Sequence, residues 1–550
     1  MSEKEKEMAK KYDVIIIGGG PNGLTEACYL SRAGLKVLVC ERRNEIGGGL
    51  ATEQITLPDF YHNTHAIYHF MGDYSPTTPD FEFEKRYGIK YIRPEHQFCM
   101  PLLDGNSVSI YTDAEKTAQS IAKFSKKDAD TYRTTVKRFA KLVDEFLGPA
   151  TYLPTLPALD AVMGMERTEW GKDINELTEM TPEDIINGLF DHDVIRTLFL
   201  WVSCHWGLQY DMTGVSYLVP LLFNRSTNYC LVQGGSHRMS NALTRFCLEY
   251  GAEILTNACV SKIIVENGVA KGIELTDGGV YTADKAVIST LDPNTTFLKF
   301  VGEKNLKPNF VEKVKGWEWD HYTLCHQHMA LREAPKFKAA DKNPDVNNAF
   351  IYVIGFENQA NLKKVWDSML KKTGELPKPE AFSCCFPSVH DPYQAPKNRC
   401  SGMISQMAPY DLKGGKDQWL RMKFKEERAE VQRQVLEKYA PNMTKKNVMF
   451  WNMTTPADIE DKFPNMVKGS IKQGAYDSLQ MGHQRPNDEC SNHITPIKNL
   501  YIGGASSYSG GFVTYGPGVT TSNKIADDLK IQKWWKPTPT IEKCWNTYFK

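Results

Sequence analysis

The sequence lacks an excess of charge of either sign, since its 550 residues include 66 Lys plus Arg and 66 Asp plus Glu. No basic patch with interleaved aromatic residues stands out, so no nucleic-acid partner is expected. No run of 18 apolar residues occurs, and no transmembrane helix is therefore expected. The charged segment from Met1 to Lys11 has no apolar centre of the kind found in secretory signals. These absences predict a cytoplasmic location.

Cysteine spacing excludes several kinds of site. The chain has 13 cysteines, an odd number, and none of them form a C-x-x-C pair. This pattern argues against a zinc centre, a redox dithiol and a disulfide framework, so no metal site is predicted. The remaining composition, 41% hydrophobic and 24% charged, is ordinary for a globular enzyme. The length suggests two or more domains.

The region from Tyr12 to Glu41 contains the most informative pattern. An apolar strand at 13–17 leads into a glycine turn that fits G-x-G-x-x-G, then a helix at about 24–34, a second strand at 36–40, and an acid. This order is typical of a dinucleotide-binding unit in a parallel sheet. The turn consists of Gly18, Gly19, Gly20, Pro21, Asn22 and Gly23.

Each part of this unit has a separate physical role. Gly18 permits the tight turn, Gly20 lets the backbone approach a pyrophosphate, and Gly23 lets the helix lie close to the sheet. The start of the helix offers free N–H groups and partial positive charge to phosphates. Glu41 can accept hydrogen bonds from a ribose.

Two later segments show related patterns. Near 233–289, a glycine turn precedes a helix, a strand and three further strands joined by turns, one of them the strong hairpin signal Asn267-Gly268. Near 499–529, a buried strand runs through a glycine-rich loop into a helix that is expected to start at about Val519, with Thr520, Thr521 and Ser522 in its first turn. Such a helix start is a second possible anion site.

The fold predicted from these segments is α/β, with a discontinuous Rossmann-type domain and an inserted mixed α+β domain. Residues 11–80, 225–300 and 490–530 would form the first domain. Residues 81–224, expected to be mostly helical, and 301–489, expected to mix strands with a helix at about 418–439, would form the second. Residues 531–550 form an aromatic tail.

A second motif follows Glu41 directly. Residues 41–52 fit E-R-x-x-x-x-G-G-x-x-x-T. With the three α/β segments, this motif resembles the flavoprotein superfamily of phytoene desaturases and flavin amine oxidases. Gly47 to Thr52 is most similar to the phytoene desaturase-like branch that includes pyridine nucleotide-disulfide oxidoreductase domain-containing protein 2. The absence of arginine at Gly49 departs from plain carotenoid desaturases and weakens any expectation of a carotene substrate.

The resemblance implies noncovalent FAD, since no cysteine occurs between Ser506 and Tyr515. It further implies that Val260 contacts adenine, and that Gly504, Gly518 and Val519 face the pyrophosphate and the flavin. The cofactor residues expected on both grounds are Gly18, Gly20, Pro21, Asn22, Gly23, Glu41, Arg42, Gly48, Gly49, Leu50, Val260, Gly504, Gly518 and Val519.

The resemblance also implies an FAD-dependent oxidoreductase. The expected reaction is desaturation, saturation or isomerisation at a carbon–carbon bond of a lipophilic, terpenoid or isoprenoid substrate, by hydride transfer at flavin N5. A quinone, oxygen or a partner protein could each serve as electron acceptor. Two alternatives remain open: a flavin amine oxidase, and a non-catalytic prenyl-binding protein of the GDP-dissociation-inhibitor type.

No single residue is identified as the catalytic base. His65, which follows the flavin motif, is the first candidate, because histidine titrates near neutral pH. Tyr508 and Tyr515 flank the C-terminal glycine loop and could border the flavin. Helix packing or an apolar tunnel would each explain the aromatic residues around His205 and Trp206.

Alternation on a strand puts His326 and His328 on one face, where they could line a cavity or be structural. The tail, with Trp534 and Trp535, could rest on its own domain, on a partner subunit or at a membrane surface.

Overall fold

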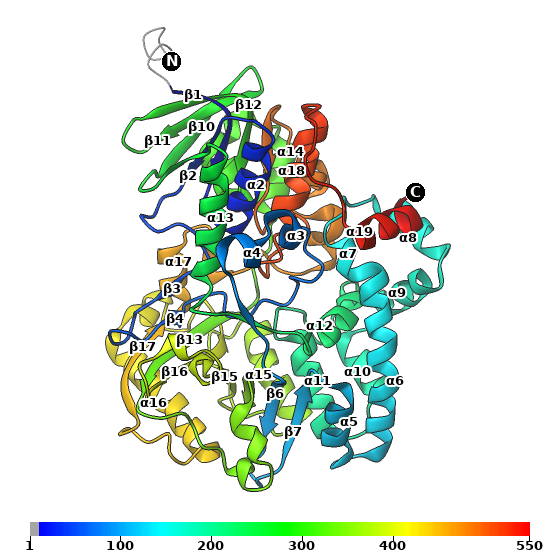
Figure 1. Ribbon diagram of the computed structural model, residues 1–550, viewed down its shortest axis with the longest axis vertical. Helices are drawn as coiled ribbons and strands as arrows, with labels where there is room; N and C mark the ends of the chain where they lie inside the picture. Colours follow the sequence, from blue (N-terminus) through cyan, green and yellow to red (C-terminus); the bar gives the residue numbers. More distant parts are fainter. Residues whose placement is uncertain (1–9) are drawn as a thin grey trace.

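The computed structural model describes residues 10–550 and contains two large sheets at opposite ends of the molecule (Figure 1). The predicted α/β class with a Rossmann-type sheet and a second mixed sheet is confirmed. Most of the charged N-terminal segment, on which the expected absence of a secretory signal rests, lies outside the described residues. Within residues 10–550, no helix is both long enough and apolar enough to cross a bilayer.

The first sheet draws its seven strands from three separated parts of the chain. Its central strands β12, β1, β2 and β9 run parallel, and β18 pairs in parallel with the end of β12. The strands in spatial order are β10 (Val260–Glu266), β11 (Val269–Leu275), β12 (Val280–Ser289), β1 (Lys10–Ile17), β2 (Val37–Cys40) and β9 (Glu253–Leu255), with β18 (Leu500–Ile502) beside β12.

Strand β1 lies in the middle because both of its faces are apolar. Val14 and Ile16 pack in one hydrophobic core, and Ile15 and Ile17 pack in the core on the other face. Ile16 pairs with Val39 on one side and with Ile288 on the other. The sheet is therefore buried on both faces near the glycine turn.

Helices cover both faces of this sheet. On one face lie α2 (Pro21–Arg32), α13 (His237–Glu249) and α18 (Gly516–Asp528). On the other lie η3 (Asn294–Gly302) and α14 (Pro308–Lys315), and the β10–β11 hairpin extends the sheet at its edge. The hairpin turns at Asn267 and Gly268, whose φ values of 51° and 75° are those that the sequence pattern requires.

The second sheet also has seven strands and is mostly antiparallel. Two of its strands, β6 and β7, come from the part of the chain that was expected to be mostly helical, and that expectation is wrong for them. In spatial order the strands are β17 (Val448–Thr454), β13 (Thr323–Leu331), β16 (Cys400–Ala408), β15 (Phe382–Cys385), β14 (Ile351–Ile354), β6 (His96–Pro101) and β7 (Ser107–Tyr111).

The other elements surround the two sheets. The helix expected at 418–439 is interrupted at Arg421, so that α16 starts at Met422. Two further strand pairs are short: β3 (Thr52–Glu53) with β4 (His62–Asn63), and β5 (Tyr91–Ile92) with β8 (Leu231–Val232). The remaining α-helices are α3 (Thr77–Phe81), α4 (Phe83–Tyr87), α5 (Ala114–Ala122), α6 (Lys126–Leu142), α7 (Gly148–Ala150), α8 (Ala158–Glu166), α9 (Glu169–Glu179), α10 (Pro182–Leu189), α11 (Asp193–Cys204), α12 (Val219–Arg225), α15 (Gln359–Leu370), α16 (Met422–Tyr439), α17 (Pro456–Lys462) and α19 (Pro539–Cys544).

The aromatic tail folds back onto its own chain. The indole N–H of Trp534 donates to the Tyr29 carbonyl over 3.0 Å, and the two rings stack with centroids 5.6 Å apart. The ring of Trp535 is buried, with its centroid 4.9 Å from that of Tyr29. Both indoles thus contact helix α2.

Candidate cofactor and substrate site

The glycine turn, Glu41 and the ends of two other strands meet at one edge of the first sheet. Gly18 follows β1, Glu41 follows β2, Thr290 follows β12 and Gly503 follows β18. These four strands are parallel, so their carboxyl ends share an edge, which is where open α/β sheets bind ligands. A cavity of about 340 Å³ lies at this edge.

Helix α2 begins at this cavity without a side-chain cap. Its N-cap residue is Gly20, Pro21 is the first helical residue, and no side chain bonds to the free N–H groups of the first turn. An uncapped helix start beside a cavity is suited to bind an anionic group such as phosphate.

The space that a Cβ atom would occupy differs between the glycines of the turn. A Cβ at Gly20 would have no neighbouring atom within 4 Å, whereas a Cβ at Gly23 would lie 2.1 Å from the Gly18 carbonyl oxygen. Gly20 therefore leaves space on the cavity side, and Gly23 permits close contact between helix and sheet. Gly48 approaches the same turn, since its Cβ would lie 3.0 Å from the Gly20 Cα.

The carboxylate of Glu41 is held by two backbone groups. The N–H groups of Gly19 and Arg43 each donate to one of its oxygens over 2.9 Å. These two contacts fix the orientation of the Glu41 carboxylate, which faces the cavity. Each carboxylate oxygen can still accept another hydrogen bond from a ligand.

The charges on this cavity suit a dinucleotide. Glu41 is the one acid among the described residues that line it, against four bases, which are Arg42, Arg43, Lys299 and Lys462. A pyrophosphate carries negative charge that such groups can neutralise. The residues present therefore fit the dinucleotide that the glycine turn predicts.

The structure distributes the predicted cofactor residues between two environments. Those on the cavity wall are Gly18, Gly20, Pro21, Asn22, Glu41, Arg42, Gly48, Gly49 and Val260. The remaining predicted cofactor residues do not line this cavity and pack against other parts of the protein. Gly23 and Gly504 approach neighbouring backbone, Gly518 lets α18 lie against Asn22 and Thr25 of α2, and Leu50 and Val519 are buried in the core.

Helix α18 starts three residues earlier than expected, at Gly516. Thr520 and Ser522 therefore lie in its second turn, where their hydroxyls donate to the carbonyls of Gly516 and Gly518. The expected anion site at Thr520 to Ser522 is not formed, because those residues are already inside the helix. The loop before the helix contacts the cavity instead, through Ala505, Gly511, Phe512 and Val513.

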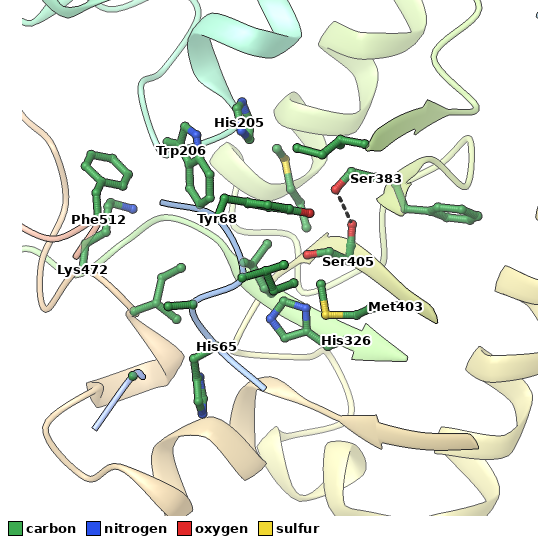
Figure 2. Close-up of a pocket in the computed structure, with 18 of the residues that line it drawn as sticks. His65, Tyr68, His205, Trp206, His326, Ser383, Met403, Ser405, Lys472 and Phe512 are labelled. Carbon is green, nitrogen blue, oxygen red and sulfur yellow. Dashed lines mark hydrogen bonds between the residues drawn. The ribbon is translucent and has the colours of Figure 1, made fainter. Parts of the chain in front are cut away.

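A second, smaller cavity of about 130 Å³ adjoins the first; we call it the chamber. It lies between the two sheets, with His326 on β13 and Met403 and Ser405 on β16 along one side, and Trp206 and Phe512 on the other (Figure 2). No Asp or Glu occurs among the described residues that line it. The wall shared by the two cavities consists of Gly49, Met466, Ile471, Phe512 and Val513.

The shared wall includes strained backbone. Phe512 and Val513 have φ values of 71° and 53°, in the left-handed region that β-branched and bulky residues rarely adopt. Such strain persists where surrounding structure enforces it, and it is frequent at functional sites. Here it directs both side chains to the wall between the cavities.

Tyr508 and Tyr515 lie elsewhere. The Tyr508 hydroxyl donates to the Ala150 carbonyl over 2.8 Å, and the ring faces a different cavity. Tyr515 is the N-cap residue of α18, and its buried hydroxyl has no partner. Neither lines the chamber or the cofactor cavity. The strained turn at 512–513 places Phe512 and Val513 there instead.

Two histidines line the chamber with unpartnered nitrogens. Both ring nitrogens of His65 and the Nδ1 of His326 are buried without a hydrogen bond. Burial penalises the charged ring and, with Lys462 nearby, lowers the pKa of His65 well below its ordinary value. Burial lowers the pKa of His326 to about 4. Both imidazoles are therefore neutral at physiological pH, and no protein group occupies these nitrogens.

Neighbouring histidines are paired or outside the chamber. His62 bonds to Thr56 over 2.7 Å, and His69 bonds to Ser236 over 3.1 Å. His328 shares a face of β13 with His326, at 6.0 Å between ring centroids, and faces His62. No three His, Cys, Asp or Glu side chains within residues 10–550 are placed to hold a metal ion.

The comparisons with known proteins support this site. The model of the "NAD(P)-binding Rossmann-like domain" matches residues 16–81, which contain the glycine turn and Glu41. Over 547 residues the chain is 37% identical to a limonene dehydrogenase subunit of Castellaniella defragrans, with 96% of each chain covered. The chain belongs to the phytoene desaturase-like family of Rossmann oxidoreductases.

Other relatives agree with this assignment. Pyridine nucleotide-disulfide oxidoreductase domain-containing protein 2 of Rattus norvegicus is 27% identical, with 94% of each chain covered. A structure of an engineered triple mutant of putrescine oxidase covers 95% of this chain and 100% of its own, with a TM-score of 0.60 and 14% identity. That likeness shows the fold alone. The predicted family and the predicted oxidoreductase activity are confirmed.

Several site residues of this phytoene desaturase-like oxidoreductase have no signal in the sequence. Lys472 lines the chamber, is buried, and forms an ion pair with buried Asp320, which also accepts from the Ser470 hydroxyl over 2.6 Å. Neither residue belongs to a motif. Phe512 and Val513 lie in the glycine-rich loop, where the flanking glycines were the available clue.

Proposed function

We propose that this protein is an FAD-dependent oxidoreductase that desaturates, saturates or isomerises a carbon–carbon bond of a lipophilic terpenoid or isoprenoid molecule. One observation carries the proposal: the dinucleotide cavity adjoins an apolar chamber through a shared wall. The redox end of a bound cofactor and an apolar substrate can meet at that wall. When bound, FAD supplies hydride transfer at its N5.

Noncovalent FAD is supported by where the cysteines lie. Cys40 and Cys259 are on the cofactor cavity, and they adjoin Glu41 and Val260 in sequence, at the end where the ribose and adenine are expected. No cysteine occurs among the residues of the shared wall. The uncapped start of α2 and the four basic residues would hold the pyrophosphate.

A terpenoid substrate is supported by the chamber and by one relative. The relative that is 37% identical is named limonene dehydrogenase, and limonene is a cyclic hydrocarbon. Aromatic and aliphatic side chains such as Trp201, Trp206 and Phe512 cover much of the chamber. Apolar molecules enter such pockets because their surface is removed from water.

His65 and His326 are the residues that would move a proton. Desaturation requires that a proton leave the carbon next to the one that gives up hydride, and a neutral imidazole can accept it. No protein group bonds to Nδ1 of His326 or to either nitrogen of His65, and in each neutral ring the one nitrogen without a hydrogen would accept the proton. A quinone, oxygen or a partner protein would serve as electron acceptor, and the relative's name as one part of a larger enzyme makes a protein partner worth testing.

The amine oxidase alternative receives less support from the chamber. A protonated amine needs a carboxylate or a cage open to cation–π contact, and the described chamber lining has no carboxylate and includes the cationic Lys472. The structural likeness to putrescine oxidase does not extend to substrate.

Anaerobic flavin reduction tests the proposal. The purified protein should be yellow, and its flavin should bleach on addition of limonene or a related cyclic alkene, but not on addition of putrescine. His65→Ala and His326→Ala should each slow reduction by about 10²-fold or more if the residue transfers the proton. Ser405→Ala, which also lines the chamber, serves as the matched control. Bleaching by the amine alone, or a colourless protein, would contradict the proposal.

A further inference from the structure

Three aromatic rings separate the chamber from another cavity. Phe70, Trp206 and Phe512 line both spaces. Their ring centroids are 6.3 Å apart for Phe70 and Trp206, 5.9 Å for Phe70 and Phe512, and 5.5 Å for Trp206 and Phe512. Each pair is within the range of direct ring contact. The rings thus form a closed triangle between the two cavities; Figure 2 shows Trp206 and Phe512 side by side.

The space beyond the rings, which we call the outer cavity, has a volume of about 380 Å³. Apolar residues from several helices line it, among them Ala161 and Val162 of α8 and Leu221 and Leu222 of α12. Helix α8 has no buried residue, and Leu159 and Met163 are 70% and 53% exposed. An apolar path therefore runs from an apolar patch on the surface, through the outer cavity, to the aromatic triangle.

The two cavities differ in the size of molecule that they can hold. The chamber's volume is about 130 Å³. An apolar cavity of about 150 Å³ in another protein binds benzene. A compact ring-shaped hydrocarbon larger than benzene would therefore fill the chamber and displace its lining side chains, whereas a long chain would have to remain partly in the outer cavity, with the rings parted.

Two of the rings stand on irregular backbone, and the third is fully enclosed. Phe70 is 5% exposed, and its carbonyl accepts from Arg225 over 3.2 Å. Trp206 follows the end of α11 and precedes Gly207, whose φ is 116°, and Phe512 lies in the strained loop. The Trp206 indole donates to the Tyr229 hydroxyl over 2.6 Å, which holds it in the closed position.

We propose that Phe70, Trp206 and Phe512 form a size-selective constriction through which a compact apolar substrate passes from the outer cavity into the chamber. This inference rests on the proposed function and adds to it the route and the size limit of the substrate. Trp206 is a specificity-determining residue in this scheme, since its removal leaves a gap between the cavities.

A binding measurement that needs no turnover tests the constriction. Limonene, a compact cyclic hydrocarbon, and phytane, a long branched one, are added in detergent to the oxidised, FAD-loaded protein, and the perturbation of the flavin absorption spectrum is titrated. In the natural protein, limonene should perturb the spectrum and phytane should not. In Trp206→Ala and Phe70→Leu, the affinity for phytane relative to limonene should rise at least about tenfold.

Two controls separate the constriction from general loosening of the core. Trp206→Phe keeps a ring and should keep the natural ratio. Phe139→Leu alters the same hydrophobic core, but Phe139 lines neither cavity, so the ratio should also be unchanged.

An unchanged ratio in Trp206→Ala and Phe70→Leu, phytane binding equal to limonene binding in the natural protein, or no limonene binding in any variant would overturn the inference. If both hydrocarbons bind as expected but none reduces the flavin, the proposed reaction fails while the constriction stands.

Discussion

Gly20 and Gly23 belong to one motif but have opposite surroundings. The space around a Cβ at Gly20 is open, and Gly20 has an ordinary φ of −76°. A Cβ at Gly23 would meet the backbone oxygen of Gly18 at 2.1 Å, which no side-chain movement can relieve. One glycine makes room for the cofactor and the other makes room for the helix.

The variants Gly20→Ala and Gly23→Ala should therefore behave differently. Gly20→Ala should weaken FAD binding at least about tenfold, because its methyl group enters the space for the pyrophosphate. The melting temperature of its FAD-free form should stay within about 2 °C of the natural protein. Gly23→Ala should destabilise the FAD-free protein by about 1–3 kcal/mol, as overpacking does. Flavin fluorescence during reconstitution and thermal melting measure these quantities. Equal melting temperatures for both FAD-free variants would refute the separation of roles.

At the scale of single elements, strand β13 carries a histidine that stays neutral in the fold. Burial lowers the pKa of His326 to about 4, from 6.5 for an ordinary histidine. The unfolded chain therefore binds this proton at higher pH than the folded protein does, and protonation favours unfolding. His326 therefore does not lower the free energy of unfolding above pH 6.5, and it lowers this free energy progressively as the pH falls from 6.5 towards 4.

We expect the free energy of unfolding to fall on acidification, with roughly 2 kcal/mol from His326 alone at pH 5. His326→Gln should make urea unfolding less dependent on pH between 7 and 5. Ser405→Ala, which alters the residue paired with His326 on β16 and adds no titratable group, should leave that dependence as it is. If the free energy of unfolding of His326→Gln changed with pH as steeply as that of the natural protein, the neutral His326 ring would contribute nothing to the pH dependence of stability.

How well elements could be predicted depends on how clearly their own residues mark them. The order of elements from β1 to Glu41 was predicted, because the strand, turn and helix lie within a short stretch and carry their own glycines, although α2 starts at Pro21 and not at the expected Leu24. Strands β6 and β7 were missed although they pair with each other as a hairpin around Asp104 and Gly105, and β6 ends in a proline. Its sequence alone has no alternation that marks a strand.

The site residues also differ in how far the sequence could predict them. Gly18 and Glu41 were predicted because motif spacing fixes them at a strand edge, whereas Val260 was predicted from the family resemblance alone. Phe70, Trp206 and Phe512 come from three distant segments, and their contact depends on how the second sheet packs against the first. Tyr508 and Tyr515 were expected nearby because they flank the right loop, but the left-handed turn at 512–513 directs other side chains to the wall.

At the scale of the whole molecule, the last residues complete the packing of the first helix. Arg32 lies 3.7 Å from the Trp534 ring centroid, and the indole bonds to Tyr29. In contrast, Trp545 stacks on Phe549 near the end of the tail, with centroids 5.4 Å apart.

Trp534→Ala should lower the free energy of unfolding by about 2–3 kcal/mol, through lost packing and a lost cation–π contact. Trp545→Ala should have a smaller effect, because its main partner is in the same terminal segment. Urea unfolding with sedimentation of the native samples measures both stability and association. If Trp534→Ala left stability unaltered but changed association, the tail would instead serve a partner.

The place of β18 in the first sheet bears on how the protein is made. This strand, at residues 500–502, sits beside β12, and the amide of Gly503 donates to the Ser289 carbonyl over 2.9 Å. A ribosome that adds about 5–20 residues per second reaches this point long after it has made β1 and the glycine turn. Until then, the emerging polypeptide has its glycine turn but not the neighbouring strand or the loop that walls the cavity. We therefore expect fragments released before this segment has emerged to bind no flavin and to be colourless.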